Sequence, residues 1–150
     1  VSLAASDLAG AWDLEEFVIR FQSDREPVFP FGKDAHGQLL YAGGRMSAVL
    51  SRADRAPLGV ASLETAGLAT VDAKAAAFSS YLSYTGSYRV EGTQVVHEVA
   101  LSLVPESCGT NHVRTVSLDG ERLVLSYQVT SSSGVVRDHV LTWRRSPAHG

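Results

Sequence analysis

Apolar and polar residues alternate along most of the chain, and this pattern limits the fold more than any other feature of the sequence. Successive side chains of a β-strand point to opposite faces, so an alternating segment offers one face to a core. The segments with this pattern, each predicted to be a strand, are residues 12–21, 37–42, 45–51, 84–90, 94–104, 111–118, 122–130 and 135–145. The chain is therefore predicted to be an all-β protein.

Short turns join most of these strands. Gly43-Gly44, Glu91-Gly92 and Asp119-Gly120 are typical of two-residue hairpins, because glycine readily adopts a positive φ. Hairpins place sequence neighbours side by side, and about eight strands can close an antiparallel up-and-down barrel around a ligand-sized interior. A sandwich of two sheets is the alternative architecture, and the hairpins between sequence neighbours favour the barrel.

Residues 71–84 break the alternation and predict one helix between the third and fourth strands. Asp72 is expected to cap its start, the alanine-rich run 73–77 favours helix, and Gly86 lies beyond its end. Tyr81 would then lie in the last turn. This helix is expected to be a lid or to plug one end of the barrel.

Composition narrows the class of protein. The 150 residues fit one domain spanning 1–150, and 45% hydrophobic with 19% charged residues is typical of a globular chain. Its apolar runs are too short for a membrane-spanning helix, and the net charge of −3 without a basic stripe disfavours nucleic acid as a partner. Cys108 is the one cysteine, so no internal disulfide can form, which suits a reducing cytoplasm. The protein is expected there as a monomer or homodimer.

The two ends of the predicted barrel carry a known motif. The Gly-x-Trp at residues 10–12 and the Trp-Arg-Arg at residues 143–145 resemble the lipocalin signature. In that family the Trp closes one end of the barrel and the Arg packs across it, as a guanidinium can stack on an indole. The resemblance implies a structural barrel floor made by Gly10, Trp12 and Arg145.

The resemblance extends through nearly the whole chain. Residues 30–41, 44–48, 74–78 and 95–97, together with Tyr81, Gly86 and Tyr88, are similar to the bacterial lipocalin-like domain family. Some small barrels of this kind resemble cyclases of polyketide pathways. The missing cysteine pair and the helix in mid-chain favour this bacterial group over secreted retinoid carriers.

His97 and Tyr88 are the first candidates for catalysis. His97 shares a strand face with Val95, Val99 and Leu101, so its imidazole is expected inside the barrel as an acid, base or hydrogen-bond donor. Tyr88 lies on the adjacent strand of the same hairpin, within reach of the same ligand. The alternative is a core histidine satisfied by a neighbouring hydroxyl or carbonyl group.

Glu16 is the third catalytic candidate. It shares a strand face with Trp12, and an inward carboxyl group in an apolar barrel would have a raised pKa. Phe17 and Ile19 occupy the opposite face, so the alternative is that they are buried and Glu16 is solvated.

Aromatic and flexible apolar side chains are predicted to line the cavity. Their bodies would shape an apolar pocket and their polar atoms would hold a carbonyl group of the ligand. Core or rim packing is the better interpretation for any single tyrosine, whereas pocket lining is the better one for the group. The predicted ligand-binding residues are Tyr41, Met46, Tyr81, Tyr84, Tyr127, His139 and Trp143.

No motif indicates a metal or cofactor. The sequence has no H-x-H, HExxH or CxxC spacing, and no nucleophile elbow, P-loop or dinucleotide motif. The first hypothesis is a cofactor-free cyclase or isomerase that folds an apolar, polyketide-like substrate, including a pericyclic reaction. The alternative is a non-catalytic carrier or sensor of a small hydrophobic ligand. A barrel filled by its own side chains is the third possibility.

Overall fold

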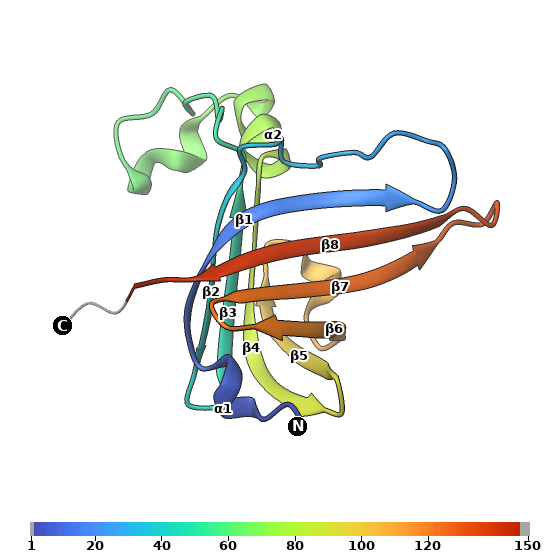
Figure 1. Ribbon diagram of the computed structural model, residues 1–150. Helices are drawn as coiled ribbons and strands as arrows, with labels where there is room; N and C mark the ends of the chain where they lie inside the picture. The colour runs from blue at the N-terminus through green and yellow to red at the C-terminus, as the bar shows by residue number, and fades with distance from the viewer. Residues whose placement is uncertain (1, 148–150) are drawn as a thin grey trace.

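The computed structural model describes residues 2–147 and shows a closed barrel of eight antiparallel strands, each paired with its sequence neighbours (Figure 1). The elements are α1 (Ala5–Leu8), β1 (Gly10–Phe21), β2 (His36–Ala42), β3 (Arg45–Ser51), η1 (Leu63–Leu68), α2 (Val71–Ser79), β4 (Tyr81–Glu91), β5 (Gln94–Ser102), η2 (Pro105–Ser107), β6 (Asn111–Asp119), β7 (Arg122–Thr130) and β8 (Val136–Arg145). The predicted barrel is confirmed and the sandwich is not formed.

The predicted hairpins are present. Gly43 and Gly44 have φ values of 57° and 77°, which L-residues with a side chain rarely adopt, and they let Ala42 pair with Arg45 across the turn. The other two turns bring Glu91 opposite Gln94 and Asp119 opposite Arg122. Local turn chemistry therefore sets the register of three of the strand pairs.

The helix lies between β3 and β4 as predicted, but it is shorter than expected. α2 ends at Ser79, and Tyr81 instead begins β4, where it pairs with Ser51 of β3. Pairing with an existing strand outweighs the local helix preference of residues 81–84. The cap is also different, because the Thr70 hydroxyl, not Asp72, accepts the N–H of Ala73 at 3.2 Å.

α2 and the segment before it lie at one end of the barrel, and α1 lies at the other (Figure 1). None of the helices in residues 2–147 combines the length and apolarity needed to cross a membrane.

A bulge in β1 changes which side chains enter the barrel. Leu14 pairs with Trp143, but the next pair joins Glu16 to Thr142, so the register shifts between them. Beyond the shift Phe17 pairs with Leu141 and belongs to the buried core. The expectation that Glu16 faces the interior is wrong, because the extra residue of the bulge reverses the alternation.

A second irregularity, between Thr85 and Gly86 of β4, acts on β5. Gly86 pairs with Val99, whereas Thr85 pairs with Leu101. Val95 and Val99 stay buried on the inner face, but Leu101 is 67% exposed. The expectation that Leu101 shares the face of His97 is therefore wrong.

A Cβ atom on Gly86 would lie 1.8 Å from the Glu98 carbonyl oxygen, so only glycine fits where the strands approach.

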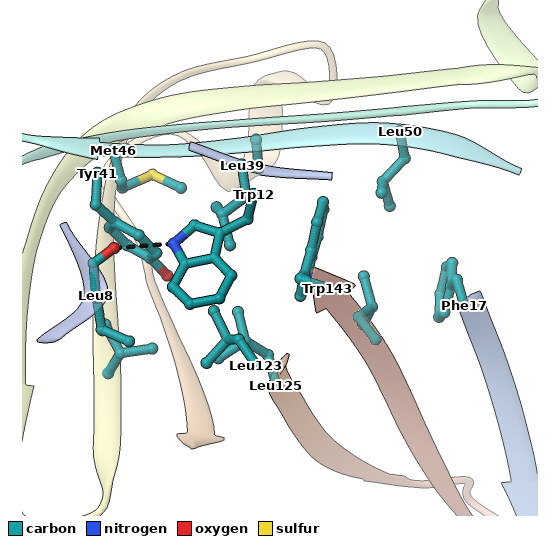
Figure 2. Packing of buried hydrophobic residues seen from close by; sticks show 13 residues of the cluster. Leu8, Trp12, Phe17, Leu39, Tyr41, Met46, Leu50, Leu123, Leu125 and Trp143 are labelled. Carbon is teal, nitrogen blue, oxygen red and sulfur yellow. Dashed lines mark hydrogen bonds between the residues drawn. The ribbon is translucent and has the colours of Figure 1, made fainter. Parts of the chain in front are cut away.

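One end of the barrel is sealed around Trp12. Its indole N–H donates to the Leu8 carbonyl group at 2.9 Å, as Figure 2 shows, and the Arg145 guanidinium lies 4.2 Å from the ring centroid. Arg145 also donates to the carbonyl groups of Ala9 and Asp7, at 2.8 and 3.0 Å. A Cβ atom on Gly10 would lie 3.2 Å from that guanidinium. These contacts join α1, β1 and β8 into the floor of the barrel.

Candidate ligand-binding site

A cavity of about 60 Å³ lies inside the barrel. Such a space holds only a few water molecules, so a larger ligand requires side chains of the wall to move. Most of the wall is apolar, and it contains no carboxylate. The residues lining the cavity are Phe17, Leu39, Ala48, Leu50, Leu82, Tyr84, His97, Arg114, Leu125, Tyr127, Leu141 and Trp143.

His97 lies on the polar part of this wall between two tyrosines. The Tyr41 hydroxyl is 2.7 Å from Nε2 of His97, and the Tyr84 hydroxyl is 2.9 Å from Nδ1. β2, β5 and β4 supply the three side chains, all from the inner face of the barrel. Both imidazole nitrogens are therefore engaged within the protein.

Burial keeps His97 neutral. Loss of solvent lowers its pKa to about 3, and the positive charge of Arg114 acts in the same direction. Burial also raises the pKa values of Tyr41 and Tyr84. At neutral pH the cluster therefore consists of one uncharged imidazole and two uncharged phenols.

The positions of the protons follow from burial. A neutral imidazole has one N–H donor and one acceptor nitrogen. Tyr41 is 1% exposed, and His97 is the hydrogen-bond partner of its hydroxyl among the described residues. If Tyr41 accepted from His97, its own buried O–H would lack an acceptor, at a cost of about 1–3 kcal/mol. We therefore assign Tyr41 O–H as the donor to Nε2 and Nδ1–H as the donor to Tyr84. The Tyr84 O–H remains available to the cavity.

Arg114 on β6, next to the strand of His97, forms a stack with Tyr127 and His139. The Arg114 guanidinium lies 3.7 Å from the Tyr127 ring centroid, and the Tyr127 and His139 rings stack at 4.6 Å. Burial is the main cause that lowers the pKa of His139 and raises that of Tyr127. The guanidinium thus gains a cation–π contact while it remains partly buried at the cavity.

This stack lies where two strands part. Paired residues of β6 and β7 run only as far as Thr115 and Ser126, although β6 starts at Asn111 and β7 continues to Thr130. A surface groove at this point is lined by Val113, Ser126 and Gln128, among others. Side chains rather than ladder hydrogen bonds close the wall here.

Four of the predicted residues line the cavity: Tyr84, His97, Tyr127 and Trp143. Trp143 is 2% exposed, and its indole Nε1–H is buried without a hydrogen-bond partner among the described residues.

Four predicted residues do not line the cavity themselves but lie next to its wall: Tyr41, Tyr88, Met46 and His139. Tyr88 contacts Tyr41 with ring centroids 4.5 Å apart, and its hydroxyl donates to the Ala5 carbonyl group at 3.3 Å. Met46 is 2% exposed in the core cluster, near Tyr41 in Figure 2. His139 reaches the cavity wall through Tyr127.

Tyr81 and Glu16 do not line the cavity. Leu82 lines it, so the preceding Tyr81 points away, and the Arg55 guanidinium lies 4.9 Å from the Tyr81 ring centroid. The β1 bulge places Phe17 on the wall instead of Glu16. A catalytic role for His97 or Tyr88 stays a prediction.

Arg114 is the main residue that the sequence reading missed. It lies on the inner face of β6, two positions after His112 and two before Val116. The alternation of residues 111–118 places this arginine on the inward, largely apolar face of the strand. A charge buried there is costly, so its presence indicates a function. Among residues 2–147, no group of three potential ligands is placed to hold a metal ion.

Comparison with known proteins gives one family and one curated relative. The lipocalin-like domain family model matches residues 9–146, which extends from just before β1 to just after β8. The 4'-hydroxy-3'-methoxypropiophenone carrier protein of Aspergillus oryzae (strain ATCC 42149 / RIB 40) is 34% identical over 82 residues, a match covering 49% of this chain and 74% of the relative.

A solved structure is also similar over most of the chain. It is a mutant of the vaccine antigen transferrin binding protein B from Haemophilus parasuis Hp5, with a TM-score of 0.43 and 10% sequence identity. The match covers 99% of this chain and 29% of that protein, so the chain spans less than a third of its length.

Proposed function

The chain belongs to the lipocalin-like domain family, and we propose that it is a non-catalytic carrier that encloses a small aryl ketone. The observation that carries this proposal is the cavity itself: an apolar, aromatic wall with a few hydrogen-bond donors and no carboxylate. The carrier role of the Aspergillus oryzae relative supports it, because the ligand in that protein's name is an aryl ketone.

The state of His97 supports carriage over acid–base catalysis. A general base needs a pKa near the working pH and a lone pair facing the substrate. His97 has a pKa of about 3, and tyrosines engage both of its nitrogens. The other two catalytic candidates, Tyr88 and Glu16, are absent from the cavity wall. A cyclase that acts only by holding its substrate in a reactive shape needs no general base. This is the competing hypothesis, and the experiment below tests it.

The experiment is a titration with 4'-hydroxy-3'-methoxypropiophenone followed by tryptophan fluorescence. Trp143 lines the cavity, whereas Trp12 lies in the floor. We expect saturable quenching that persists in Trp12→Phe and is largely lost in Trp143→Phe. Ligand recovered from the complex should be chemically unchanged.

Two results would contradict the carrier proposal. Absence of saturable binding of this ketone and of related aryl ketones would remove it. Conversion of a bound ketone or polyketide-like compound faster than in buffer would instead favour the cyclase hypothesis. Location in the cytoplasm and assembly as monomer or homodimer remain predictions for this carrier.

A further inference from the structure

Arg114 brings a positive charge to the cavity wall without a carboxylate partner. The ion pairs within residues 2–147 involve Arg52, Arg89 and Arg144. Arg114 instead contacts the Tyr127 ring, and its Nη1 donates to the Val113 carbonyl group at 3.1 Å. A cation next to an apolar space is costly unless a negative charge approaches it. The barrel wall therefore favours an anionic group in the cavity.

The neighbours of Arg114 add donors but no negative charge. Tyr84 on β4 keeps an O–H directed to the cavity, because its oxygen accepts the Nδ1–H of His97. The titratable groups that face Arg114 from the surrounding strands are Tyr41, Tyr84, His97, His112, Tyr127 and His139. Arg137 and Asp138 flank His139, and the Asp138 carboxylate accepts from the Gln128 amide at 2.7 Å at an exposed position. The groups that face Arg114 are uncharged at neutral pH, so the site prefers an acceptor oxygen with a full negative charge.

We propose that the ligand binds as an oxyanion, with its ionised oxygen held by the Arg114 guanidinium and by the Tyr84 O–H. This inference rests on the proposed carrier function and adds the charge state of the cargo. A phenol with an acyl group in the para position matches this charge preference, because its negative charge spreads onto the carbonyl oxygen and it is more acidic than phenol itself. Such a ligand is larger than the 60 Å³ cavity, so side chains of the wall move when it binds. The site takes the phenolate from water, and the phenol proton goes to solvent.

The test uses the change in absorption when such a phenol ionises. 4'-Hydroxy-3'-methoxypropiophenone is titrated with protein at a pH below its own pKa in water, where the free compound is a neutral phenol. We expect the phenolate band to appear on binding. The pH of half-ionisation should fall by about one unit or more, which corresponds to at least tenfold tighter binding of the anion.

Variants and a modified ligand assign the effect to Arg114. Arg114→Gln should abolish the shift and weaken phenolate binding at least tenfold, while Arg114→Lys should keep part of the shift. Arg122→Gln is the matched control, since it removes an equal charge from an exposed position on the neighbouring β7. The 4'-methoxy ether of the ligand cannot ionise and should bind equally well to wild type and Arg114→Gln. Circular dichroism of each variant confirms that the barrel is folded.

The outcomes separate this inference from the carrier proposal. Binding of the phenol with an unchanged neutral spectrum, or a phenolate shift that survives in Arg114→Gln, would overturn the inference and leave the carrier intact. Failure of both the phenol and its ether to bind would overturn the carrier proposal and the inference with it.

Discussion

The Tyr41 hydroxyl lies 2.7 Å from Nε2 of His97, and this contact joins β2 to β5 through the interior of the barrel. His97 is 0% exposed, so the hydrogen bond is made away from water. The second nitrogen of the same ring is 2.9 Å from the Tyr84 hydroxyl. The cluster of Tyr41, His97 and Tyr84 therefore links three strands by hydrogen bonds. Through the tautomer of His97, it also leaves the Tyr84 O–H as a donor for the cavity.

Tyr41→Phe should destabilise the protein more than Tyr88→Phe. The first change leaves Nε2 of His97 buried without a partner, which costs about 1–3 kcal/mol. The two rings are in contact, but the Tyr88 hydroxyl makes only a longer, exposed bond of 3.3 Å to Ala5. Chemical denaturation monitored by circular dichroism measures both free energies of unfolding. Equal losses in the two variants would argue against the importance of the Tyr41–His97 bond.

Stability should fall as the pH is lowered below the ordinary pKa of histidine. In the folded barrel His97 stays neutral down to a pKa of about 3, whereas in the unfolded chain it takes up a proton near 6.5. Protons therefore favour the unfolded state between these values, by about 1.4 kcal/mol per pH unit for one group. His112 and His139, whose pKa values burial also lowers, act in the same direction.

The variant His97→Gln isolates this contribution. It should be less stable than wild type at neutral pH but should lose less stability between about pH 6 and pH 3, because the titrating group is gone. His36→Gln, at an exposed position at the start of β2, serves as the control. If His97→Gln and wild type show the same slope of unfolding free energy against pH, His97 is not held neutral.

Gly86→Ala should severely destabilise the barrel. The added methyl group would lie 1.8 Å from the Glu98 carbonyl oxygen, so β4 and β5 would have to separate. Overpacking of this kind typically costs about 1–3 kcal/mol or more. Gly67→Ala is the matched control, since a Cβ atom there meets nothing within 4 Å. Thermal unfolding of both variants compares them, and a Gly86→Ala protein as stable as the control would contradict the predicted clash.

Arg145→Ala should cost more stability than Arg144→Ala, although the two residues are adjacent. Arg145 stacks on Trp12 and donates to two carbonyl groups of the α1 segment, which together contribute about 1–3 kcal/mol. Arg144 makes an exposed ion pair with Glu15 that contributes about 0–1 kcal/mol. Urea denaturation gives both values. The reverse order would mean that the Trp12 floor does not depend on the guanidinium.

Tyr84→Phe should weaken ligand binding in a protein that still folds, although it leaves Nδ1–H of His97 without an acceptor and so should also cost about 1–3 kcal/mol of stability. Loss of a hydrogen bond to a charged oxygen costs about 1.5–3 kcal/mol, which is roughly 10- to 100-fold in Kd. Of the two tyrosines bonded to His97, Tyr84 is the one whose O–H is free for the cavity, and the variant removes this O–H. Calorimetric titration with the aryl ketone measures the change. An unaltered Kd would exclude Tyr84 as a ligand donor.

Local sequence determined the strands, their order and their turns. Alternation and glycine-containing turns act between residues close in the chain, so residues 122–130 and the turn at Gly43 and Gly44 could be placed without any tertiary information. The resemblance of the Gly-x-Trp motif to the lipocalin signature likewise indicated the floor, which Trp12 and Arg145 form where β1 pairs with β8.

Only the tertiary structure decided which side chains face the cavity. A bulge adds one residue opposite the partner strand, so every side chain beyond it points to the other face. The register shift between β1 and β8 therefore places Phe17 instead of Glu16 on the wall. The sequence of β1 alone does not reveal this shift. His97 makes hydrogen bonds with Tyr41 and Tyr84, which lie 56 and 13 residues away in the sequence, and these bonds likewise exist only once the barrel closes. Sequence periodicity defines a strand and its two faces, whereas the register between strands selects the residues that meet inside.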